Sequence, residues 1–455
     1  MMFHQNWKKR IIFCLLFTLL FVSTITLNII LPKQSAIAVK EEDWDMFLQQ
    51  KNFIQAVNEV EQHWERDYEN YFDENLGDFS VTAEDIAETL SNSSQQTGTK
   101  PAVIWVWQRQ KQMQLILITP GTKPEIYSVT DADRQKLINT IRRLNVEITN
   151  PRKRNTTSYL EPAQKLYEWM VKPLESRLET EKIDTIMFCL GLGLRTLPLA
   201  VLHDGENFII EKYAVARIPA FNLIDTNYNK IKNAQILAMG ASEFKELSSL
   251  PAVPVEINKI TRFLWEGKAF INQEFTVKNL QQQRQKQAYE IVHLATHAEF
   301  RPGKPDKSYI QFWNDEQISL DEVEKLKLNQ PPVELLVLSA CRTALGDREA
   351  ELGFAGLTVK SGVRSALASL WNVSDIGTLA LMTEFYEHLQ KTPLKAEALR
   401  QAQVVMLKGK VGIDQGELNG TRGELQLPPE LAEFGDATFS HPYYWSAFTL
   451  IGNPW

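Results

Sequence analysis

Ile291-Val292-His293-Leu294-Ala295-Thr296-His297 is a short apolar run that ends in a histidine, and Leu335-Leu336-Val337-Leu338-Ser339-Ala340-Cys341 is a second run that ends in a cysteine. Continuous β-favouring runs of this length are typical of fully buried strands in a parallel sheet. In open α/β sheets, sites form beyond the carboxyl ends of the strands. The sequence therefore predicts that His297 and Cys341 end two strands and meet at one edge of a sheet.

Strands and helices alternate on both sides of these two runs. Further strands are predicted at Gln235–Gly240, Tyr309–Trp313, Ser365–Trp371 and Trp445–Ile451, and helices at Val255–Glu266, Ile376–Leu389 and Ala396–Leu407. Lys408–Ser440 is rich in glycine and proline and is expected to be a surface excursion. This alternation predicts an α/β fold, a three-layer α/β/α sandwich, over residues 246–455.

Two more regions precede this one. Residues 99–245 contain a predicted strand pair, Ala102–Trp107 and Leu115–Thr119, and a predicted strand at Phe208–Ile218, which indicates an N-terminal α/β part. Residues 39–98 carry apolar side chains at helical spacing and read as a small helical region that ends in a polar linker, Ser91–Gly98.

The first 38 residues have the pattern of an export signal or a membrane anchor. Lys8, Lys9 and Arg10 precede an apolar stretch from Ile11 to Leu31, and Ala36-Ile37-Ala38 fits a small-residue cleavage site. The stretch is also long enough to span a bilayer. Since basic residues ahead of it keep the N-terminus cytoplasmic, both alternatives place the rest of the chain outside, with membrane contact only through this segment.

Composition excludes several classes of protein. The 455 residues carry a formal net charge of −7 and show no basic stripe, so no nucleic-acid partner is expected. Three cysteines exclude a disulfide scaffold. Cys189 lies in an apolar run and is expected to pack as a small hydrophobe.

His293 and His297 have the spacing of a helical zinc site, but the residues around them favour a strand. On a strand these positions lie about 13 Å apart, too far to share an ion. We therefore expect no metal and no cofactor, and His293 is expected to be a satisfied interior histidine.

Cys341 and His297 together are typical of nucleophilic catalysis. The imidazole would raise the thiolate fraction and later protonate the leaving amine. The backbone N–H groups of Cys341 and Ala298 are the predicted donors to the tetrahedral oxyanion. The alternative is a buried structural cysteine beside a core histidine, and spacing alone does not decide between the two.

From about Tyr159 to Trp455 the chain resembles the CHAT family, relatives of caspases and separases. The motifs that carry the resemblance are Leu197–Gly205, His293–His297, Leu338–Gly346, Ser369–Asp375 and His441–Trp445. The resemblance implies a caspase-like fold, a pseudo-caspase-like part within 99–245, and a catalytic dyad of His297 and Cys341. The family usually has glycine after the histidine, where this chain has Ala298. If that position requires a positive φ, alanine is strained there and displaces an oxyanion donor.

Three further residues are candidates for substrate binding. An acid at the position of Asp375 lines the pocket for a basic P1 side chain in separase-like relatives, and the alternative role is an N-cap for the following helix. Glu351, with Asp347 and Glu349, makes the segment after Cys341 acidic, which either adds to a basic preference or is simply solvated. Trp371 is either a pocket wall or a core aromatic.

The leading hypothesis is a cysteine endopeptidase that cleaves a protein or peptide substrate after a basic residue. The alternative is a catalytically silent CHAT scaffold that binds a partner protein. The helical region 39–98 is a capping subdomain or a surface for such a partner, since one repeat-like unit cannot stack into a solenoid.

Overall fold

A continuous sheet organises the molecule. The computed structural model describes residues 41–50, 52–77, 81–421 and 423–455, and the predicted leader lies outside this part. Thirteen strands of the described residues form one sheet. Its main path runs β10 (Gln317–Ser319), β9 (Tyr309–Gln311), β8 (Ile291–Phe300), β11 (Leu335–Thr343), β12 (Ser365–Ser369), β17 (Phe448–Gly452), β5 (Ala214–Ile218), β4 (Thr185–Leu190), β1 (Pro101–Gln108), β2 (Met113–Ile118) and β3 (Glu125–Val129).

The centre of the sheet is mostly parallel. β8 pairs in parallel with β11 and with β6 (Ile236–Gly240), which in turn pairs with β7 (Gly267–Ile271). Since β6 pairs with β8, it lies in the C-terminal half of the sheet, although the sequence grouped it with residues 99–245. The predicted α/β fold class is confirmed.

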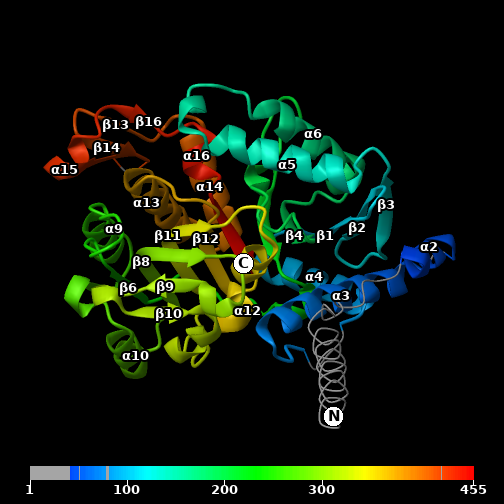
Figure 1. Cartoon of the computed structure of the whole chain (residues 1–455), viewed down its shortest axis with the longest axis horizontal. Helices are drawn as coiled ribbons and strands as arrows, with labels where there is room; N and C mark the ends of the chain where they lie inside the picture. The colour runs from blue at the N-terminus through cyan, green and yellow to red at the C-terminus, as the bar shows by residue number, and fades with distance from the viewer. Residues whose placement is uncertain (1–40, 51, 78–80, 422) are drawn as a thin grey trace, which may run out of the picture.

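Helices pack around the sheet in the order expected from the alternation. α9 (Val253–Lys259), α13 (Asp375–Lys391) and α14 (Lys395–Leu407) form one packed group, and α11 (Arg348–Ala355) and α12 (Leu357–Ser361) form another. α5 (Arg134–Thr149) and α6 (Leu160–Met170) pack together over the N-terminal half, and α10 (Val277–Lys286) contacts the helical turn Leu320–Leu326 (Figure 1).

The N-terminal helical region is α2 (Glu41–Gln49), α3 (Phe53–Phe72) and α4 (Ala83–Thr97), drawn in blue beside the β1–β4 half in Figure 1. A capping box between Thr82 and Asp85 starts α4. The predicted linker Ser91–Gly98 is wrong, because α4 continues to Thr97. Its hydroxyl-bearing residues bond back to carbonyls one turn earlier, and Gly98 ends the helix at a φ of 74°.

One other expectation needs correction. The predicted strand Phe208–Ile218 begins as a helical turn, α8 (Ile209–Lys212), because the Glu211 carboxylate accepts the Phe208 N–H, and only β5 is extended. The excursion Lys408–Ser440 contains a four-stranded sheet, ordered β15 (Gly423–Gln426), β14 (Glu417–Gly420), β13 (Gly412–Asp414) and β16 (Ala437–Thr438). No helix within the described residues is long and apolar enough to cross a membrane.

The two halves of the sheet meet where β17 pairs with β5, at Ile451 and Arg217. Arg217 is 2% exposed, and its guanidinium donates to Thr449 Oγ1 at 3.1 Å, to Leu197 O at 2.7 Å and to Arg195 O. A buried cation therefore ties the segment after β4 to the last strand of the chain.

Candidate active site

His297 and Cys341 lie on neighbouring parallel strands, as the sequence predicts, but neither residue ends its strand. β8 continues to Phe300 and β11 to Thr343. Tertiary contacts extend both strands: the Phe300 ring packs against Phe354 of α11, and Thr343 N donates to Leu370 O. His297 is the register partner of Ala340, and Cys341 is the partner of Ala298, after an irregularity between Leu338 and Ala340.

The His297 ring is half-buried and oriented by one loop. Its Nε2 lies 2.8 Å from the Ser248 carbonyl oxygen, and its ring centroid lies 4.8 Å from that of Phe244. Because a carbonyl only accepts, Nε2 carries the proton in the neutral ring and Nδ1 is left as the proton acceptor. A base whose second nitrogen is held by a third group is the arrangement that nucleophile activation requires.

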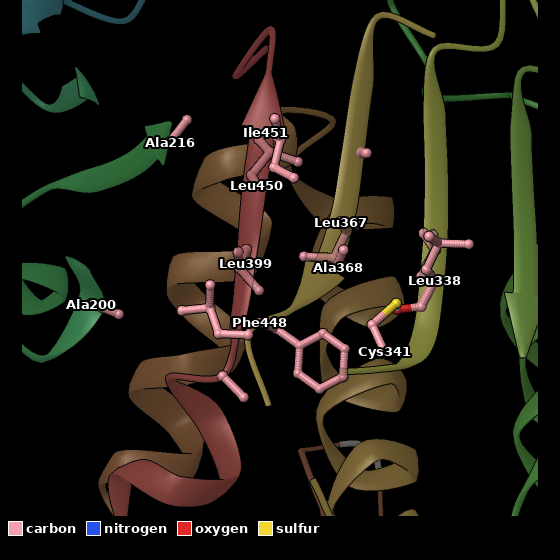
Figure 2. Packing of buried hydrophobic residues seen from close by; sticks show 14 of the residues in the cluster. Ala200, Ala216, Leu338, Cys341, Leu367, Ala368, Leu399, Phe448, Leu450 and Ile451 are labelled. Carbon is pink, nitrogen blue, oxygen red and sulfur yellow. The ribbon is translucent and has the colours of Figure 1, made fainter. Parts of the chain in front are cut away.

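The Cys341 thiol is held in the apolar core. Cys341 is 1% exposed, and Figure 2 shows it in the cluster that also contains Leu338, Leu367 and Phe448. Its Sγ donates to the Leu338 carbonyl oxygen at 3.4 Å, and burial raises the pKa of the thiol to about 12. Within the described residues no hydrogen bond joins this sulfur to His297. In this conformation Cys341 is therefore a protonated thiol and not a nucleophilic thiolate.

Ala298 has ordinary strand geometry. It is 1% exposed and pairs with Cys341 on one side and with Ile310 on the other. Its φ does not lie in the left-handed region, so the strain considered for alanine at this position does not arise. The two predicted oxyanion donors are thus opposite one another in the ladder between β8 and β11.

Asp375 is the first residue of α13 and does not cap it. The N-cap is Ser374, whose Oγ accepts the Gly377 N–H at 3.3 Å, so the N-cap alternative for Asp375 is wrong. Asp375 Oδ2 instead accepts the Ala252 N–H at 2.5 Å, at the start of α9. Burial, with a smaller contribution from repulsion by Glu256, raises the pKa of Asp375 to about 7.

Comparison with known families identifies the chain. The model of the CHAT domain matches residues 160–453. The chain belongs to the CHAT domain family. No curated protein sequence matches it significantly.

Some solved structures resemble the chain at low identity. Separase in the Saccharomyces cerevisiae separase–securin complex has 10% identity and a TM-score of 0.47, over 89% of this chain and 34% of the separase chain. The Arg-specific cysteine proteinase gingipain R has 13% identity and a TM-score of 0.38, over 68% of this chain and 69% of that chain. This chain therefore spans about a third of the separase chain it resembles.

Two predicted substrate-binding residues of the CHAT domain, Trp371 and Glu351, are buried and form hydrogen bonds with backbone groups of the same chain. Trp371 is 6% exposed and donates from Nε1 to Tyr443 O at 3.1 Å, as a core aromatic does. Glu351 is 1% exposed, so the solvated alternative is wrong for this residue. Its carboxylate accepts from Gly193 N at 2.8 Å and from Thr196 Oγ1 at 3.0 Å. The acidic segment folds as α11, with Asp347 as its N-cap.

A buried polar network near Asp375 was only partly visible in the sequence of the CHAT domain. His293 is fully buried, with Nε2 2.7 Å from Glu256 Oε1 and Nδ1 3.1 Å from the Tyr386 hydroxyl. The prediction of a satisfied interior histidine is confirmed. Its partners lie on α9 and α13, far away in sequence, and no spacing signal pointed to them. Within the described residues, no cluster of three or more His, Cys, Asp or Glu side chains could hold a metal ion.

Proposed function

We propose that this CHAT domain is a cysteine endopeptidase in which Cys341 is the nucleophile and His297 the base. The observation that carries the proposal is the placement of His297: its strand adjoins that of Cys341, and the Ser248 carbonyl holds Nε2 so that Nδ1 accepts a proton. Membership of the CHAT family supports the same assignment.

The reaction follows from these roles. Nδ1 of His297 takes the thiol proton, and the Cys341 thiolate attacks the substrate carbonyl carbon. Backbone N–H groups at Ala298 and Cys341 would stabilise the oxyanion. His297 then returns the proton to the leaving amine as the C–N bond breaks, and water hydrolyses the thioester to regenerate the thiol.

Activation needs a local rearrangement. The Cys341 sulfur bonds to Leu338 O, and burial holds its pKa near 12, so few molecules in this conformation are thiolates at neutral pH. Rotation of the 338–341 segment toward His297 would expose the sulfur and remove this burial. The register between β8 and β11 is irregular between Leu338 and Ala340, so the ladder is interrupted where such a rotation would take place.

The alternative function is a silent scaffold that binds a partner protein, and the deep burial of Cys341 is the observation that favours it. Labelling of Cys341 by a peptide electrophile with Arg at P1 separates the two. An endopeptidase reacts stoichiometrically, and His297→Ala slows labelling by about 100-fold, within the range that a general base contributes.

Cys189 provides the matched control, because it is fully buried in β4 with Sγ bonded to Pro219 O. Cys189→Ala should leave labelling unchanged. If labelling occurs only after unfolding, or is equal in the unmutated protein and His297→Ala, the peptidase assignment fails and the scaffold is favoured.

A further inference from the structure

A small aromatic pocket lies beside His297. It has a volume of about 170 Å³ and is formed by two loops, Glu243–Lys245 after β6 and Trp313–Asp315 between β9 and β10. Phe244 and Trp313 supply its apolar surface, and the exposed Lys245–Asp315 ion pair, at 3.0 Å, joins the two loops at its rim. A pocket of this volume suits one amino-acid side chain rather than a larger ligand.

Hydrogen bonds to neighbouring segments hold both loops in place, so the pocket exists before any ligand binds. Asn272 Oδ1 accepts the Ser242 N–H at 2.9 Å, which holds the start of the first loop. Trp313 N donates to Phe275 O at 3.1 Å, which holds the second. A preformed pocket loses little conformational entropy when it is filled.

Phe244 connects the pocket to the proposed chemistry. Its ring lines the pocket and also makes an edge-type contact with the His297 ring, with 4.8 Å between the ring centroids. His297 must protonate the leaving amine, which belongs to the residue after the scissile bond. The part of the substrate that passes the His297 ring is therefore the segment on the leaving-group side.

We infer that this pocket binds an apolar side chain, of the size of leucine or phenylalanine, from the first or second substrate residue after the scissile bond. The inference rests on the proposed peptidase function and adds a second specificity site to it. Aromatic walls favour an apolar group because they offer area without donors or acceptors. A charged side chain would lose solvation against them, and the rim charges Lys245 and Asp315 are already paired with each other.

The test uses internally quenched peptides with Arg before the scissile bond and Leu, Phe, Gly or Asp at each of the two positions after it. The unmutated protein should cleave the Leu and Phe peptides at one of those positions with kcat/KM at least about 10-fold above Gly. Trp313→Leu should reduce this ratio to below about 3-fold, while labelling of Cys341 by a small thiol reagent stays unchanged.

Phe263→Ala is the matched control, since Phe263 is 72% exposed and lies outside the pocket. It should keep the full preference. Thermal unfolding of Trp313→Leu checks that the variant is folded, and Lys245→Glu, at the exposed rim, offers a milder change that should further disfavour Asp. Equal kcat/KM for Leu and Gly peptides at both positions would overturn the inference while leaving the peptidase assignment intact.

Binding to the Cys341→Ala variant, followed by fluorescence anisotropy of the same peptide sequences with the fluorophore but without the quencher, needs no turnover. If no peptide is cleaved but Leu peptides bind more tightly than Gly peptides, and Trp313→Leu removes the difference, the pocket stands and the chemistry fails. If neither cleavage nor binding depends on the residue after the scissile bond, the pocket assignment is wrong.

Discussion

Asp375 is the residue that the sequence predicts to contact a basic P1 side chain. Its pKa is raised to about 7 by burial, so the side chain is neutral below pH 7 and a carboxylate above it. A neutral carboxyl group cannot form a charge-assisted pair with a guanidinium. If Asp375 recognises a basic P1 residue, discrimination must therefore strengthen as pH rises through about 7.

We predict that the ratio of kcat/KM for a P1 Arg peptide to that for its uncharged citrulline analogue rises from pH 6 to pH 8. Using a ratio cancels the pH dependence of the chemical step, which affects both peptides equally. Asp375→Asn should make this ratio nearly independent of pH. It should also lower the ratio at pH 8 by roughly 30-fold or more, which corresponds to about 2 kcal/mol. A pH-independent ratio in the unmutated protein would show that Asp375 serves only to hold Ala252 N.

At the scale of elements, the join between β5 and β17 depends on Arg217. Its burial lowers the pKa to about 9, and three donor–acceptor contacts compensate for the loss of solvent. Two of the acceptors are the backbone carbonyls of Arg195 and Leu197, in the segment after β4. Removing the guanidinium therefore leaves buried acceptors unpaired.

Arg217→Met should lower the free energy of unfolding by about 2–5 kcal/mol, measured by urea denaturation. Arg143→Met is the control, because Arg143 pairs with Glu161 on the surface, where both side chains are more than half exposed. That change should cost less than about 1 kcal/mol. Similar losses in the two variants would mean that the sheet join does not depend on the buried cation.

At the scale of the whole molecule, the helical region is joined to the CHAT domain by buried charge. Asp67 of α3 is 6% exposed and pairs with Arg195, which is 2% exposed, at 2.7 Å. Its other oxygen lies 3.5 Å from Arg348 of α11, the helix that follows the Cys341 strand. These contacts make α3 part of the support for the segment after Cys341, which favours a capping subdomain over a detached partner-binding array.

Asp67→Asn should destabilise the protein by about 3–5 kcal/mol, because it leaves Arg195 buried without its counter-charge. The double variant with Arg195→Met should recover part of the loss, since it removes that uncompensated charge as well. Hydrogen exchange should show faster exchange in α11 of Asp67→Asn than in the unmutated protein. Unchanged exchange in α11 would mean that α3 and α11 are only neighbours.

Local sequence patterns predicted much of the fold. The apolar runs that contain His297 and Cys341 are buried strands, because a continuous β-favouring run has no polar face to expose. Their adjacency followed from the rules of parallel sheets. The ends of elements were less predictable: α4 absorbed a polar segment that resembled a linker, because serine and threonine side chains can satisfy carbonyls within a helix.

What the sequence determined by itself is the α/β class and the place of His297 and Cys341 on adjoining strands, since these depend on residue type and on short-range periodicity. Only the tertiary structure decided that Ser248 orients His297, that Cys341 points its sulfur at Leu338 O, and that Glu351 binds Gly193 and Thr196. The His297 and Glu351 contacts depend on where groups far away in the sequence arrive. The Cys341 contact depends on the backbone path between Leu338 and Cys341, and the pKa of its thiol depends on burial. None of these is encoded in the spacing of residues along the chain.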